Sequence, residues 1–152
     1  MTAYIPSNAL VLVGDGRNAR FLRNKGSPRH PEFVIEREVN LANPPTRDQG
    51  TDRPGRKPGT DGVSRTAIEE TDWHQRAEQQ FAVEIAETLY EMEHAHKFAE
   101  LVVIAPPKML GDLRAAFHPE VSRCIVAEVP KNLTAQPVRE LARVLSTDSP
   151  PP

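Results

Sequence analysis

Three short apolar runs constrain the fold of this chain more than any other feature. They occupy residues 9–13, 101–105 and 124–129, and each is typical of a strand buried inside a sheet. Residues 17–24 and 33–41 instead alternate apolar and polar side chains after glycine-containing turns, which predicts two more strands joined by hairpins. The runs therefore predict about five strands, three before the middle of the chain and two after it.

Amphipathic segments predict helices over residues 72–96, 108–117 and 136–145. The first carries apolar side chains at every fourth position: Trp73, Ala77, Phe81, Ile85 and Leu89. The order β-β-β-long loop-α-β-α-β-α predicts one α/β domain over residues 1–145, with a mixed sheet and covering helices. The remaining residues, 146–152, include SerProProPro and are predicted to be a disordered tail.

Alternation along the hairpin strands predicts which side chains share a face of the sheet. Ala19 and Phe21 should lie on one face, with Arg20 and Leu22 on the other. In the third strand, one face should hold Phe33, Ile35, Arg37, Val39 and Leu41.

A basic loop rich in glycine and proline is predicted between the third strand and the first helix, at residues 43–71. Its first 23 residues, 43–65, contain one aliphatic side chain, Val63. Five cations and three aspartates give this stretch a charge of +2, within a chain of −2. A long loop inside a compact domain is either functional or disordered, and both interpretations stay open. Arg53 and Arg56 suit either a solvated turn or the capture of phosphate.

The predicted strand directions bring four segments to one edge of the sheet, where open α/β sheets bind ligands. These are the turn after the first strand, the long loop, residues 106–108 and residues 130–132. The candidate contacts to an anion or to RNA are Arg17, Arg53, Arg56, Lys57, Lys108 and Lys131. The candidate accessory residues are Asp15, Asp52 and His74.

Several classes of function are disfavoured by composition. A charge of −2 and a pI near 6.2 argue against a DNA-coating protein. No stretch reaches the 18 apolar residues that suggest a membrane span, and the N-terminus lacks the pattern of a signal peptide. The single cysteine, Cys124, permits no internal disulfide and fits a reducing compartment, so a cytoplasmic protein is expected.

No cofactor or metal is predicted. Gly14, Gly16 and Ala19 match a dinucleotide fingerprint loosely, but the segment that follows is too short for a crossover helix, so a glycine turn is the better interpretation. His94 and His96 would sit roughly 200° apart on a helix and would not share a metal ion. The oligomeric state is left open.

Five segments together resemble the bacterial host-attachment protein family, and more remotely the middle domain of archaeal and eukaryotic peptide-chain release factors. The segments are LVGDGRNARFL, TDRPGR, HQRAEQQFAVEIAETL, LVVIAPPKMLGDLR and VAEVPKNLT. The resemblance implies a mixed-sheet α/β domain. In release factors, a Gly-Gly-Gln tip in the loop before a long helix enters the peptidyl-transferase centre. The most similar sequence in this chain, Asp48-Gln49-Gly50, is not that motif, so the resemblance assigns no catalytic residue.

The favoured hypothesis is a non-enzymatic cytoplasmic module that contacts RNA, in the ribosome or in tRNA, through the basic loop and the adjoining edge. One alternative is a hydrolase or nucleotide-binding enzyme at the same edge, using Asp15, Lys108 or His74. The other is an interaction protein exposed to the host.

Overall fold

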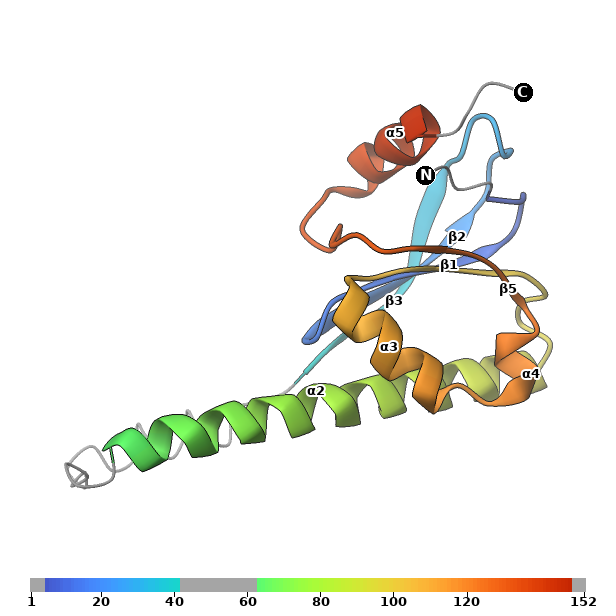
Figure 1. Ribbon diagram of the computed structural model, residues 1–152. Helices are drawn as coiled ribbons and strands as arrows, with labels where there is room; N and C mark the ends of the chain where they lie inside the picture. The colour runs from blue at the N-terminus through green and yellow to red at the C-terminus, as the bar shows by residue number, and fades with distance from the viewer. Residues whose placement is uncertain (1–4, 42–62, 149–152) are drawn as a thin grey trace.

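The computed structural model describes residues 5–41 and 63–148, with side chains described to Leu41 and again over residues 73–145 (Figure 1). The elements follow in this order: β1 (Leu10–Gly14), β2 (Asn18–Asn24), β3 (Phe33–Asn40), α2 (Val63–His94), β4 (Leu101–Ile104), α3 (Pro107–Ala116), α4 (Pro119–Ser122), β5 (Ile125–Val129) and α5 (Val138–Asp148). The predicted order of strands and helices is confirmed. The short helix α4 is an addition that no apolar periodicity predicted.

The five strands form one mixed sheet in the order β3-β2-β1-β4-β5. The β1–β2 and β2–β3 pairs are antiparallel, whereas the β1–β4 and β4–β5 pairs are parallel. Strands β1, β3, β4 and β5 therefore all end at the same edge, which we call the carboxyl edge. The predicted α/β class and strand directions are confirmed.

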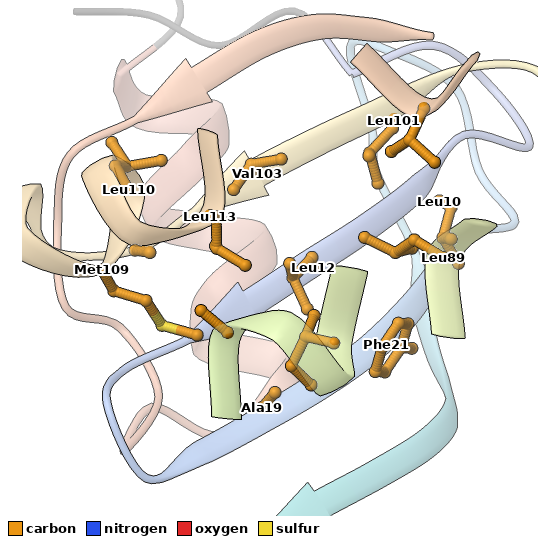
Figure 2. Packing of buried hydrophobic residues seen from close by; sticks show 14 of the residues in the cluster. Leu10, Leu12, Ala19, Phe21, Leu89, Leu101, Val103, Met109, Leu110 and Leu113 are labelled. Atoms are coloured by element: carbon orange, nitrogen blue, oxygen red, sulfur yellow. The ribbon is translucent and has the colours of Figure 1, made fainter. Parts of the chain in front are cut away.

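Helices cover both faces of the sheet, with α2, α3 and α4 on one side and α5 on the other (Figure 1). Strand β1 shows the division: Leu10 and Leu12 face α2 and α3, while Val11 and Val13 face α5. Figure 2 shows Leu12 and Phe21 of the sheet packed with Leu89 of α2 and Leu113 of α3. Both faces of β1 and β4 are buried, which explains their continuous apolar sequence.

A β-bulge divides the apolar side chains of β3 between the two faces. The register passes from Phe21↔Arg37 to Leu22↔Ile35, so Glu36 is an extra residue in the strand. Phe33 packs on the α5 side, whereas Val39 and Leu41 pack on the α2 side. The prediction of a single face for Phe33, Ile35, Arg37, Val39 and Leu41 was wrong, because one added residue reverses the alternation. The faces predicted for β2 are confirmed, with Ala19 and Phe21 opposite Leu22.

The other edge strand also contains a bulge. In β5, Val126 is the extra residue between the Leu101↔Ile125 and Val102↔Ala127 pairs. Bulges at edge strands hinder pairing with a further strand, so neither open edge of the sheet presents a regular template to another chain.

Helix α2 begins at Val63, nine residues before the predicted start at Asp72, and its first half extends past the carboxyl edge (Figure 1). Phe81 is fully buried, but Trp73 is 40% exposed. Trp73 therefore continues the periodic pattern of the helix without joining the core, because the sheet no longer lies beneath this part of α2. Residues 63–71, assigned to the loop from sequence, are helical.

The end of α2 has a Schellman motif, in which His96 takes the left-handed conformation with φ 59°. Its N–H donates to the Glu93 carbonyl at 2.9 Å, and the N–H of Lys97 donates to the Met92 carbonyl at 2.8 Å. The helix therefore ends at His94, two residues before the predicted end. The last helix, α5, continues to Asp148 and so includes three residues of the predicted tail.

Among the helices that the structure describes, none has the length and apolar character needed to cross a bilayer. Residues 42–62, which carry most of the predicted basic loop, lie outside the described residues.

Candidate functional site at the carboxyl edge

The turn between β1 and β2 is organised around the carboxylate of Asp15. Its Oδ1 accepts hydrogen bonds from the backbone N–H groups of Arg17 at 2.8 Å and Asn18 at 2.7 Å. Its Oδ2 accepts the hydroxyl of Thr134, in the segment after β5, at 2.8 Å. Partial burial raises the pKa of Asp15, but the hydrogen bonds from Arg17, Thr134 and Asn18 together outweigh it, and the net pKa lies below its usual value. Asp15 is thus a poor proton acceptor and a strong fixed charge.

A second polar side chain also fixes the segment after β5. Arg20 of β2 donates through Nη2 to the carbonyls of Thr134 and Gln136, both at 2.7 Å, and of Leu133 at 3.3 Å. Because three carbonyls share one guanidinium, the backbone of this segment is held against β2. Two strands that are not neighbours in the sheet are thereby coupled at the carboxyl edge.

A cavity of about 350 Å³ opens beside this turn, and we call it the edge cavity. It is lined by Asp15, Gly16, Arg17, Asn18, Glu78, Pro106, Lys108, Met109, Asp112 and Asn132. These residues come from the β1–β2 turn, α2, the start of α3 and the segment after β5. The edge that sequence predicted as a working surface therefore contains a real concavity.

Charges of both signs line the edge cavity. The ammonium of Lys108 lies 3.7 Å from a carboxylate oxygen of Glu78 and 3.5 Å from one of Asp112. The Glu78 side chain crosses directly over Gly16, where an added Cβ would lie 2.7 Å from Glu78 Cδ. Lys108 is thus balanced locally by two carboxylates, and the cavity is less basic than sequence suggested.

The first turn of α3 lies beside the same cavity, which Pro106, Lys108 and Met109 help to line. Its N-cap is Pro106, which has no side-chain cap, and its first residue is Pro107. Both prolines lack an N–H, so the first helical donors are the backbone N–H groups of Lys108 and Met109. Such groups favour an anion at the start of a helix.

A chain of contacts joins α2 to the β1–β2 turn outside the cavity. Arg17 Nη2 lies 3.3 Å from Nδ1 of His74, within hydrogen-bond distance. The His74 ring meets the indole of Trp73 edge to face, with centroids 5.6 Å apart and an interplanar angle of 77°. His74 therefore connects an exposed aromatic ring to a cation of the carboxyl edge.

The structure brings together only part of the predicted site. Asp15, Arg17 and Lys108 line the edge cavity, and His74 contacts Arg17. Lys131 is exposed beside the cavity but does not line it. The four other candidates lie outside the described residues: Asp52, Arg53, Arg56 and Lys57.

Five polar residues of the site were not candidates from sequence: Asn18, Glu78, Asp112, Asn132 and Thr134. They come from β2, α2, α3 and the segment after β5, and they form no motif. Glu78 alone had a signal, because it follows His74 by one helical turn and so shares its face of α2. Within the part of the chain that the structure describes, no three His, Cys, Asp or Glu side chains cluster closely enough to hold a metal ion.

Comparison with known proteins gives one family match. The model of bacterial archaeo-eukaryotic release factor family 12 matches residues 8–145, which includes every strand of the sheet. No curated protein matches the chain. The match supports the likeness to release factors expected from the sequence, and its description does not refer to host attachment.

Proposed function

This chain belongs to bacterial archaeo-eukaryotic release factor family 12, and on that premise we propose that it is a translation-related module that contacts RNA through its carboxyl edge. The RNA is ribosomal RNA or tRNA, and the place of contact is the cytoplasm. An effect on attachment to host cells would then be indirect.

The observation that carries this proposal is that β1, β3, β4 and β5 all end at the carboxyl edge. Arg17 follows β1, Lys108 follows β4 and Lys131 follows β5. The segment after β3 contains Arg53, Arg56 and Lys57 in its sequence. Because Lys108 is balanced by Glu78 and Asp112, we assign most of the electrostatic attraction to the cations of that segment.

A binding role is favoured over catalysis for two reasons. The Gly-Gly-Gln tip of release factors is missing from the chain. The pKa of Asp15 is lowered by hydrogen bonds that also occupy both of its oxygens, so this carboxylate suits the shaping of a surface better than proton transfer.

The salt dependence of RNA binding tests the proposal. The variant Arg53→Ala, Arg56→Ala, Lys57→Ala should bind ribosomes and tRNA more weakly, and its log–log salt slope should fall by about 2 to 3. A matched control replaces Lys25, Arg29 and Lys97, three exposed cations at the opposite edge of the sheet. Wild-type protein that binds neither ribosomes nor tRNA at low salt would refute the proposal, as would equal loss in the two variants.

A nucleotide-binding role is the second candidate, and the edge cavity is the observation that favours it. Its volume of about 350 Å³ and its donors from Lys108 and Met109 suit a small phosphate-bearing ligand. A thermal-shift screen across nucleotides, with and without Mg²⁺, distinguishes this candidate, because a specific ligand raises the melting temperature by mass action. The shift should disappear in Lys108→Ala if the ligand occupies the edge cavity.

A further inference from the structure

Trp73 is an exposed tryptophan at the carboxyl edge, and neither the fold nor the edge cavity explains its exposure. Trp73 is 40% exposed, in the half of α2 that extends past the sheet. An indole is a large apolar surface, and its exposure forgoes the stabilisation that burial supplies. Val83, ten residues later on α2, is exposed to the same 40% and provides a natural comparison.

The residues around Trp73 determine which kind of ligand its ring can bind. His74 meets its ring edge to face and also lies 3.3 Å from the Arg17 guanidinium. Arg76, exposed on the same helix, lies one turn further along. An accessible aromatic face with guanidinium groups nearby is the combination that binds single-stranded nucleic acid, in which a base stacks on the ring and the cations accompany the backbone.

We propose that Trp73 stacks an unpaired base of the RNA, with Arg17 positioned beside it through His74. This inference rests on the proposed function and narrows its partner to RNA with unpaired nucleotides. A base inside a duplex already has both faces stacked and offers none to the indole, so duplex RNA should not use this contact.

The chain contains one tryptophan, so tryptophan fluorescence reports on this position alone. A single-stranded 12-nucleotide RNA should quench that fluorescence, and the same sequence in a duplex should not. In an independent measurement with end-labelled RNA, Trp73→Ala should weaken single-strand binding at least about fivefold. Trp73→Phe should lose less, because a smaller aromatic face remains. Val83→Ala should bind as the wild type does.

The outcomes separate this inference from the proposed function. If labelled single-stranded RNA binds while tryptophan fluorescence is unchanged and Trp73→Ala binds normally, the stacking contact is refuted and the RNA-binding function stands. If single-stranded and duplex RNA quench equally, the preference for unpaired bases is refuted. If no RNA binds the wild type, both proposals fall. The quenching measurement needs no substitution, so it remains decisive even if a variant folds poorly.

Discussion

The hydroxyl of Thr134 donates to Asp15 Oδ2 at 2.8 Å, which links the segment after β5 to the turn after β1 across 119 residues of chain. The same hydroxyl oxygen lies 2.8 Å from Oδ1 of Asn132, a residue of the edge cavity. One carboxylate therefore connects the two segments that flank the end of β4. The shape of the carboxyl edge depends on this link.

Replacement of Asp15 by Asn should lower stability at pH 7 by roughly 0.5–1 kcal/mol, a small effect because the side chain is only partly buried. The pKa of Asp15 is lowered in the folded state, so its contribution is present above the unfolded pKa and is lost as pH falls through the folded pKa. Urea unfolding of wild type and variant should thus differ at pH 7 and converge in acid, as the pH falls through the lowered pKa of Asp15. Thr134→Val removes one donor and should show a smaller difference. A difference that persists or grows in acid would contradict the assignment.

Two glycines should respond differently to replacement by alanine. At Gly26 an added Cβ would lie 2.2 Å from the carbonyl oxygen of His30, which is backbone, so Gly26→Ala should cost about 2 kcal/mol or more. At Gly16 the nearest atoms belong to the flexible end of Glu78, so Gly16→Ala should cost less than about 1 kcal/mol. The addition of Glu78→Ala should remove most of the smaller cost. Thermal unfolding checks this order, with a lower melting temperature expected for Gly26→Ala than for Gly16→Ala. The reverse order would show that the Glu78 side chain is held rigidly.

His96→Gly should stabilise the protein by roughly 0.5–1 kcal/mol, because glycine adopts a φ of 59° without the steric penalty of a side chain. The change keeps both backbone hydrogen bonds of the Schellman motif. Ala95→Gly, at the preceding residue with negative φ, is the matched control and should destabilise. Chemical unfolding of the two variants checks the pair, and a destabilised His96→Gly would mean that the imidazole makes a compensating contact.

Cys124 should react slowly with alkylating agents in the folded protein. Burial raises the pKa of its thiol, and the negative charge of Glu93 raises it further. The reactive thiolate is therefore scarcer at pH 8 than in an unfolded chain. Labelling with iodoacetamide, followed by mass spectrometry, should be several-fold faster in 8 M urea at the same pH. Equal rates would indicate that the thiol is more accessible than its packing implies.

The sequence predicted the architecture well because the decisive signals were local. Two fully buried strands read as continuous apolar runs, and short turns and crossovers then determined the strand directions. The bulge at Glu36 was hidden, since alternation in a sequence does not reveal an unpaired residue. The early start of α2 was hidden as well, because apolar periodicity marks only the part of a helix that packs against the sheet.

The candidate site was predicted less completely, because its residues meet only through tertiary structure. Glycines and cations after strands predicted the position of Asp15, Arg17 and Lys108. Nothing in sequence indicated that Glu78 and Asp112 would balance Lys108. Arg20 was predicted to face away from Phe21, but its hold on three carbonyls after β5 depends on how α5 returns to the sheet.

Because α2 runs past the sheet without interruption, it fixes both the distance of its first residues from the sheet and the rotation of its residues about the helix axis. Eighteen residues separate Val63 from Phe81, which at 1.5 Å per residue is about 27 Å of rigid rod. Each residue inserted between His74 and Phe81 would turn the imidazole by about 100° around the helix axis, away from Arg17. The present number of residues between His74 and Phe81 is therefore what brings the imidazole to Arg17, in the turn after β1.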